Sequence, residues 1–167
     1  MPRFIEKLLN TATNTHSTNK LPEVRKLFAD YLDYHKQRKT AERFSILEEI
    51  YNRNDHFDVD LLYNELKKKK LAVSRATVYN TLDLLVECGL VVRHQFGSQQ
   101  SMYEKSYGFR QHDHLICNEC KKVFEFCDPR VSEIQNMMGK LLHFDIQQHS
   151  LILYGNCRVE DCQRKNA

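Results

Sequence analysis

Two pairs of cysteines near the ends of the second half of the chain place the tightest constraint on how that half folds. Cys117 and Cys120 have the C-x-x-C spacing of a zinc knuckle, in which a tight turn lets both thiolates reach one ion. Cys157 and Cys162 form a second pair near the C-terminus, with four residues between them. Together the four thiols would complete a closed tetrahedral site, which stabilises a fold and carries out no reaction. Two disulfides are the alternative.

The rest of the sequence bears on the choice between zinc and disulfides. No apolar run in the 167 residues approaches the roughly 20 that a membrane-spanning helix needs. The N-terminus lacks the apolar core and small-residue cleavage site of a signal peptide. We therefore expect a cytoplasmic protein with no membrane partner. Thiols stay reduced in that compartment, so the cysteines favour a metal site.

A second group of candidate ligands lies just upstream of the knuckle. His112 and His114 are two residues apart, and in an extended strand this spacing puts both imidazoles on the same face. The pair predicts a second metal site. A pair of solvated surface histidines is the alternative.

Four amphipathic helices are predicted in the first half of the chain, because apolar residues recur there at helical spacing. Thr40, Asp58 and Ser74 are suited to cap helix N-termini, and Gly89 is suited to end the last helix. The predicted helices run from Leu21 to about His35, from Thr40 to about Asn54, from Asp58 to about Lys70, and from Ser74 to Gly89.

Two strands joined by a short turn follow the fourth helix, at 90–96 and 101–104. Helices followed by a hairpin indicate a winged helix, in which the last helix enters the DNA major groove. The residues predicted to contact DNA are those on the exposed start of that helix, together with one arginine that could reach a phosphate: Arg75, Thr77, Tyr79, Asn80 and Arg43. A protein-interaction module with plain surface residues at these positions is the alternative.

The net charge of +3 lies in the same half, since residues 1–105 hold 17 Lys and Arg against 14 Asp and Glu, and the remainder holds 8 of each. Only the first half therefore has a net attraction for phosphates.

The second half is predicted to contain strands at 113–117, 123–126 and 149–154, with a helix at 129–142. About 60 residues form a small domain, which usually needs a metal or a partner subunit for stability. The predicted fold class is α+β, with an N-terminal winged-helix DNA-binding domain and a C-terminal α/β dimerisation domain that contains the structural zinc site. The predicted division is a flexible extension at 1–20, the winged helix at 21–105, a hinge at 106–111, and the dimerisation and metal-binding domain at 112–167.

Other residues that can bind metals have plainer interpretations. Cys88 and Cys127 have apolar or strand neighbours and are predicted to be buried small hydrophobic residues. The histidines outside the motifs are predicted to lie on the surface: His16, His35, His94 and His143.

Three motifs resemble those of the ferric uptake regulator family, bacterial metal-responsive transcription factors. They are Ala76-Thr77-Val78-Tyr79, the run from His112 to Cys120, and the run from His149 to Cys157 with Cys162. The resemblance covers about Thr40 to Cys162. It implies a homodimeric repressor, not an enzyme, that binds an inverted repeat in double-stranded operator DNA. It leaves open whether dimers pair into tetramers.

The resemblance also implies a regulatory metal site drawn from both domains. Matched residue by residue, its ligands are His56, Glu104, His112, His114 and Glu125. Such a set of imidazoles and carboxylates suits Fe(II), Mn(II) or Co(II). Peroxide sensors of the family tend to have Asp at the two Glu positions, so the resemblance implies an Fe(II)-responsive regulator of iron homeostasis, with Mn(II), Co(II) or Zn(II) able to substitute. A sensor for peroxide, zinc or manganese is the alternative within the family.

Two departures from the family pattern stand out. A third metal site of the family keeps two of its ligands here, Asp113 and His149, while Gln111 and Ser132 replace the others. Asn80 stands where the family commonly has Arg.

Outside the family, two histidines and a carboxylate also occur in non-haem iron enzymes, and four cysteines occur in zinc-ribbon adaptors. Neither alternative explains the predicted winged helix together with His56 and Glu104.

Overall fold

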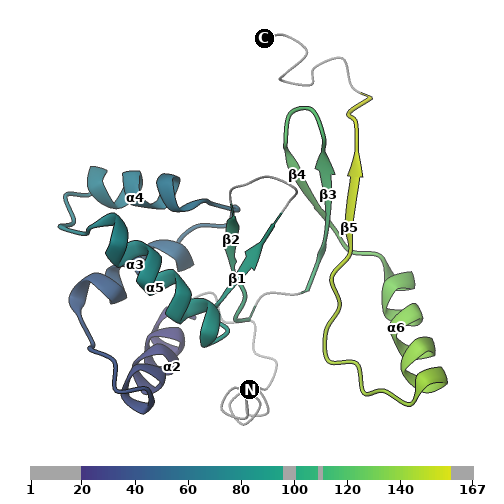
Figure 1. Cartoon of the computed structure of the whole chain (residues 1–167), viewed down its shortest axis with the longest axis horizontal. Helices are drawn as coiled ribbons and strands as arrows, with labels where there is room; N and C mark the ends of the chain where they lie inside the picture. Colours follow the sequence, from purple (N-terminus) through teal and green to yellow (C-terminus); the bar gives the residue numbers. More distant parts are fainter. Residues whose placement is uncertain (1–19, 96–100, 109–110, 159–167) are drawn as a thin grey trace. The chain divides into compact units, whose positions relative to one another are not determined.

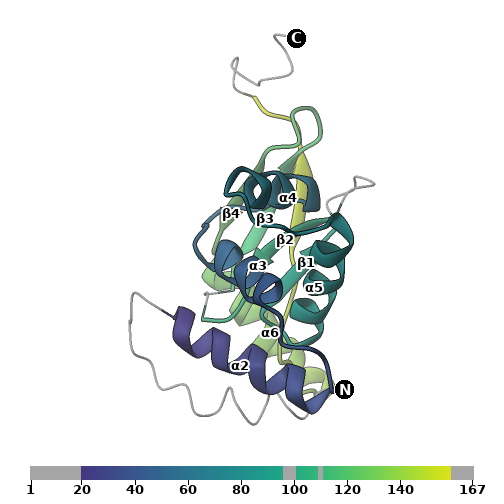
Figure 2. The same cartoon turned by 90° about the vertical axis from the view of Figure 1, so that its left-hand side faces the viewer.

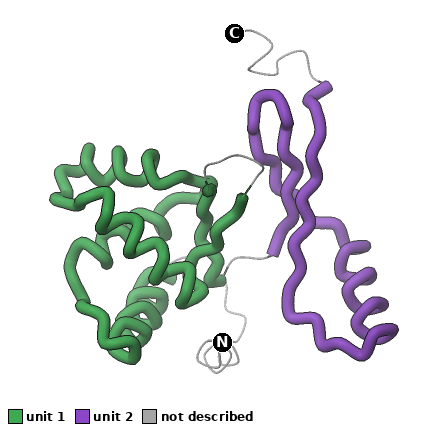
Figure 3. Tube along the Cα trace, viewed as in Figure 1, with its two compact units in different colours: residues 1–109 green, residues 110–167 purple. Residues whose placement is uncertain are grey.

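The computed structural model describes residues 20–95, 101–108 and 111–158. The chain divides into two compact units, residues 1–109 (unit 1) and 110–167 (unit 2), shown in Figure 3. The predicted N-terminal extension up to residue 19 and the predicted turn from residue 97 to 100 lie outside the described residues. No helix in the described ranges is long and apolar enough to cross a membrane.

In the residues that the structure describes, unit 1 contains four helices and a hairpin, as the sequence predicted (Figure 1). The side chains of Thr40, Asp58 and Ser74 each accept a hydrogen bond from a backbone N–H in the first turn of the helix that follows, which confirms all three predicted caps. The elements are α2 (Leu21–Tyr34), α3 (Ala41–Tyr51), α4 (Val59–Lys68), α5 (Arg75–Glu87), β1 (Val91–His94) and β2 (Met102–Lys105).

The core of unit 1 forms where α3 packs against α2, α4 and α5, an arrangement that can be followed in Figures 1 and 2. Burial of apolar side chains from every helix removes a large area from water and supplies the main driving force for this packing. The largest side chains that are completely buried in it are Phe28, Leu32, Ile46, Leu47, Ile50, Phe57, Leu62, Leu66, Leu82 and Leu85.

A short backbone pairing attaches the segment before α4 to the hairpin. Phe57 and Tyr103 exchange both backbone hydrogen bonds, at 3.0 and 2.7 Å, as an isolated antiparallel bridge. Their rings stack with centroids 5.9 Å apart and are buried in the core. Since side chains alternate along extended chain, the neighbours of these two residues point away from the core.

Between residues 111 and 158, unit 2 forms a three-stranded sheet in the order β4-β3-β5 and one helix. The central strand β3 (Asp113–Cys117) pairs antiparallel with β4 (Val123–Phe126) and parallel with β5 (Ile152–Gly155). The parallel partner is reached through α6 (Pro129–Leu142). The last strand was predicted from residue 149, but it begins at Ile152, because the ladder with β3 starts at the pair His114 and Ile152.

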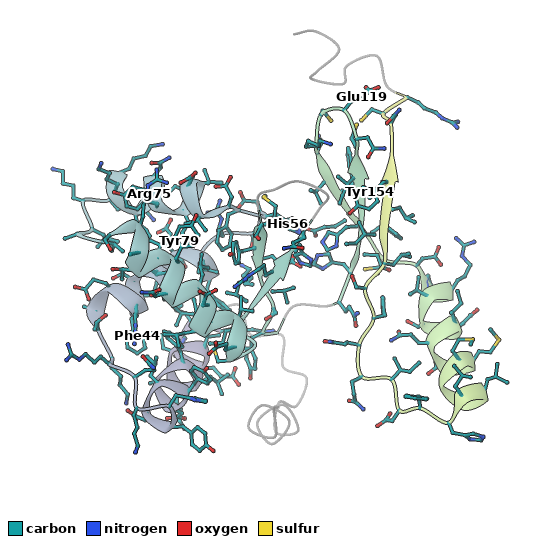
Figure 4. All side chains as sticks on the ribbon, in the orientation of Figure 1. Phe44, His56, Arg75, Tyr79, Glu119 and Tyr154 are labelled. Atoms are coloured by element: carbon teal, nitrogen blue, oxygen red, sulfur yellow. The ribbon has the colours of Figure 1, made fainter. Side chains whose placement is uncertain are left out.

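Unit 2 leaves many apolar side chains exposed. None of the α6 residues is buried. Three strand residues that are cross-strand neighbours, Phe124, Leu115 and Leu153, are 42%, 40% and 45% exposed. Further exposed apolar residues lie on β5, on α6 and just after it, and Figure 4 labels the first of them: Tyr154, Ile134, Met137, Leu141, Leu142 and Phe144.

Helix α4 offers a matched test of the unit 1 packing. Leu62 is completely buried, whereas Leu61 next to it is 41% exposed. We expect Leu62→Ala to lower the free energy of unfolding by about 2–5 kcal/mol, since it removes buried methyl groups and leaves a cavity. Leu61→Ala carries the same change in helix propensity and should cost less than about 1 kcal/mol. Urea unfolding followed by circular dichroism measures both, and equal losses would contradict the placement of α4.

Candidate metal centres and nucleic-acid interface

Three of the four predicted zinc ligands come together in unit 2. The sulfur atoms of Cys117, Cys120 and Cys157 lie within 4.8 Å of one another, and those of Cys120 and Cys157 are 3.9 Å apart. Two thiolates bonded to one zinc ion at about 2.3 Å in a tetrahedron lie roughly 3.8 Å apart. None of these cysteines is in a disulfide. Cys162 lies outside the described residues.

The strand pairing explains how cysteines so far apart in sequence meet. Cys117 ends β3, and its parallel partner on β5 is Gly155, two residues before Cys157. The backbone N–H of Asn118 also donates to the Gly155 carbonyl at 2.8 Å, which holds the knuckle turn against the end of β5. The parallel register therefore brings the second cysteine pair to the first.

The thiol of Cys117 has a lowered pKa. Hydrogen bonds, first from the backbone N–H of Cys120 and then from the Cys157 thiol, lower the pKa of Cys117 to about 6. The thiolate is the form that binds zinc.

The two other described cysteines lie outside this cluster. Burial raises the pKa of the Cys88 thiol to about 12. Cys88 is buried as predicted, but the same prediction for Cys127 was wrong, because that side chain is exposed.

Unit 1 holds two of the predicted regulatory ligands next to each other. His56 precedes Phe57 and Glu104 follows Tyr103, so the antiparallel bridge places them opposite one another on the face away from the core. His56 Nε2 lies 3.3 Å from Glu104 Oε2, and both side chains are largely shielded from solvent. Figure 4 labels His56 in the segment before α4.

Unit 2 holds the other three regulatory ligands. The rings of His112 and His114 lie 4.9 Å apart, as their spacing in an extended chain predicted. Glu125 is the cross-strand partner of His114, and its Oε1 lies 3.8 Å from His112 Nε2. Each unit therefore presents imidazole and carboxylate groups side by side.

The two remaining residues of the third site are also close together. His149 Nε2 lies 3.0 Å from Asp113 Oδ1, while His149 Nδ1 lies 2.8 Å from Gln135 Oε1. The side chain of Gln111 donates to the backbone carbonyl of His149 at 2.6 Å. Both ring nitrogens of His149 therefore have protein partners.

The exposed start of α5 carries the side chains predicted to contact DNA. Tyr79 is 49% exposed, and Asn80 is exposed beside it. Arg75 lies one turn before Tyr79 on α5 (Figure 4), forms a salt bridge with Asp60, and stacks over a tyrosine ring of α4. Thr77 is only half-buried, and its hydroxyl lies 2.8 Å from that of Ser74 at the helix cap.

A basic surface pocket of about 600 Å³ adjoins this face. Two of its lining residues, Thr40 and Ser74, are the N-caps of α3 and α5, and helix N-termini favour anions. The guanidinium of Arg43 donates to the Arg38 carbonyl at 2.6 Å. The lining residues are Lys36, Gln37, Arg38, Thr40, Glu42, Arg43, Ala72, Ser74, Thr77 and Asn80.

Comparison with known proteins identifies the family. The sequence model of the Ferric uptake regulator family matches residues 35–154. A Ferric uptake regulation protein of Cupriavidus metallidurans is 33% identical over 130 residues, which make up 77% of this chain and 90% of that protein. The chain belongs to the ferric uptake regulator (Fur) family.

Solved structures of Fur proteins show the same fold. The Ferric uptake regulator from Pseudomonas aeruginosa, determined with manganese, is 26% identical with a TM-score of 0.70, over 78% of this chain and 98% of that chain. A peroxide stress regulator from Campylobacter jejuni is 29% identical with a TM-score of 0.58, over 70% and 98%. Fur proteins are transcription regulators that bind DNA as dimers, and the family contains no enzymes, so the metalloenzyme and zinc-ribbon adaptor interpretations do not apply.

The contacts of two residues beside these sites were not predicted from the sequence. His94 was predicted to lie on the surface, but only 13% of its side chain is exposed and its Nε2 lies 2.6 Å from Glu104 Oε1. Gln135 was assigned no role, although it contacts His149. Alternation along β1 was a usable signal for His94, because Arg93 and His94 must point to opposite faces of the hairpin. No sequence signal was available for Gln135.

Proposed function

We propose that this Fur protein is an Fe(II)-responsive repressor that binds an inverted repeat in operator DNA as a homodimer, with zinc in its cysteine cluster. The observation that carries the proposal is the arrangement of ligand groups within each unit. His56 faces Glu104 in unit 1, while in unit 2 His112 lies beside His114 and Glu125. Neither set by itself supplies five ligands.

Ligation of one ion by both sets would join the two units. A bound divalent metal supplies charge and directional coordination that no side-chain pair offers. Joint ligation by His56 and Glu104 with the unit 2 residues would restrict rotation about the predicted hinge, and would thereby set the spacing of the two α5 helices in a dimer. DNA half-sites have a fixed spacing, so the restricted form would bind operator more tightly. By linkage, the gain in DNA affinity equals the gain in metal affinity on DNA.

The donor set favours iron as the regulatory metal. Three imidazoles and two carboxylates mix borderline nitrogen with hard oxygen, which suits five- or six-coordinate Fe(II), Mn(II) or Co(II). Glu104 and Glu125 occupy positions where peroxide sensors tend to have Asp. A longer carboxylate at both positions supports iron sensing over peroxide sensing.

The cysteine cluster fits structural zinc. Its sulfur spacing matches a tetrahedral zinc site, and the lowered pKa of Cys117 favours the thiolate that such a site requires. We propose Cys117, Cys120, Cys157 and Cys162 as the ligands. Asp113 and His149 are instead proposed to form a metal-free contact that links β3 to α6 through Gln135, since Gln111 and Ser132 stand where the family has the other two ligands of this site.

The exposed apolar residues of unit 2 support dimerisation. The row formed by Phe124, Leu115 and Leu153 runs across the sheet, and α6 buries none of its residues within the chain. Exposed apolar surface of this extent marks an interaction site. A second copy of the chain offers the same surface, as a two-fold symmetric interface requires.

The zinc proposal predicts opposite outcomes for two cysteine variants. Cys117→Ser should lose zinc and unfold unit 2, because structural zinc contributes on the order of 10 kcal/mol that is also folding free energy. Cys127→Ser is the matched control, since Cys127 is exposed and lies outside the cluster. Zinc content by atomic absorption and oligomeric state by sizing chromatography measure the effect. A Cys117→Ser dimer with full zinc content would contradict the site.

The DNA-binding face is tested with two asparagines. Asn80→Ala should weaken operator binding by about 1–3 kcal/mol and leave binding to unrelated DNA unchanged, because a base contact carries specificity. Asn136→Ala makes the same substitution on exposed α6 and should have no effect. Fluorescence anisotropy with both DNAs measures these affinities. An equal loss on both DNAs would place Asn80 at the phosphate backbone.

The regulatory site is tested by metal-dependent DNA binding. Wild-type protein should bind operator roughly 5–150-fold more tightly with Fe(II), or with Mn(II) as an air-stable substitute, which corresponds to a coupling of about 1–3 kcal/mol. His112→Ala should lose this dependence and keep its zinc, whereas His35→Ala, on the exposed end of α2, should keep both. Operator affinity is titrated against each metal after a mild chelator has removed the weakly bound ion.

Equal wild-type affinity with and without metal would rule out metal regulation. A response to zinc alone, or release of DNA on addition of peroxide, would reassign the protein to another kind of sensor within the family.

A further inference from the structure

The carboxylate of Glu104 contacts a second histidine of unit 1 that belongs to none of the proposed ligand sets. His94 Nε2 lies 2.6 Å from Glu104 Oε1, and His56 Nε2 lies 3.3 Å from Glu104 Oε2. All three side chains are at most 15% exposed. The two imidazoles thus meet different oxygens of one shielded carboxylate.

Strand register produces this arrangement. On the hairpin, His94 pairs with Met102, which puts it diagonally across from Glu104 on the same face. On the other side of β2, the bridge between Phe57 and Tyr103 brings His56 opposite Glu104. Glu104 is therefore held between two neighbouring segments of backbone, and one histidine comes from each.

The two distances have different chemical meanings. Two atoms bonded to one ion at about 2.1 Å lie roughly 3.0–3.4 Å apart, the edge of an octahedron or a tetrahedron. The separation of 3.3 Å between His56 Nε2 and Glu104 Oε2 fits that edge. The separation of 2.6 Å between His94 Nε2 and Glu104 Oε1 is too short for it and has the length of a strong hydrogen bond. Because a carboxylate only accepts, the His94 ring is the donor.

We propose that His94 is a positioning residue for the regulatory metal, an inference that rests on the proposed function. Its Nε2–H donates to Oε1 of Glu104 and leaves Oε2 facing His56. The two proposed ligand atoms, His56 Nε2 and Glu104 Oε2, are therefore already at a separation suited to one ion. Without this hydrogen bond the orientation of the carboxylate is less restricted, and metal binding must then order it further. Hydrogen bonds to metal ligands from such outer partners typically change affinity by 10–100-fold.

The test measures Mn(II) affinity of the full-length, zinc-loaded protein. Free Mn(II) is followed by electron paramagnetic resonance during titration. His94→Leu removes the donor and should weaken Mn(II) binding by about 10–100-fold. His94→Gln retains an N–H at similar reach and should recover most of that loss. His35→Leu removes an exposed histidine of the same unit and should bind as wild type does, while His56→Ala, which removes a ligand, should bind most weakly.

Three results would overturn the inference. Unchanged affinity in His94→Leu would show that the hydrogen bond does not affect the site. Equal losses in His94→Leu and His94→Gln would show that the donor is not what matters. A loss in His94→Gln as large as in His56→Ala would make His94 a metal ligand itself. Zinc content and the thermal midpoint of each metal-free variant separate these results from unfolding. If wild-type protein binds no Mn(II) at this site, the proposed function fails and the inference with it.

Discussion

The double hydrogen bond between Phe57 and Tyr103 is the interaction on which the organisation of unit 1 depends. Its two rings lie in the hydrophobic core, while the residues beside them, His56 and Glu104, point the other way. The pairing thus couples core packing to ligand geometry. A shift of one residue in its register would bury the two proposed ligands and expose the rings, so the stability of the core also protects the arrangement of the proposed site.

The strand β3 has the corresponding role in unit 2. Alternation along β3 and the residue before it places His112 and His114 on one face and Asp113 on the other, which separates the proposed regulatory ligands from the contact with His149. Its antiparallel partner β4 contributes Glu125, and pairing with its parallel partner β5 places Cys157 near Cys117 and Cys120. One five-residue strand therefore aligns ligands for two proposed metal sites. Unit 2 buries little of its own apolar surface, and small domains of this kind depend on metals and partner subunits for stability.

The surface of unit 1 combines two features that suit DNA. Basic residues and helix N-caps surround the pocket, and such groups favour phosphates of any sequence, whereas the exposed start of α5 carries the side chains proposed to contact base edges. The salt bridge of Arg75 to Asp60 lies in solvent, where such pairs contribute little. Arg75 can therefore exchange this partner for a nucleic acid at small cost.

The sequence by itself determined the helices and their N-caps, the presence of each strand, the spacing of the cysteine pairs and the relation between His112 and His114. Each of these features depends on local periodicity or short spacing. In a helix or strand, the backbone geometry then fixes which side chains share a face. Only the tertiary structure decided that His94 lies against Glu104, that Gln135 contacts His149, and that Cys127 is exposed. The partners of His94 and Gln135 depend on strand register and on where α6 lies along the sheet. Those arrangements are set by packing between segments distant in the chain, and no local pattern records them.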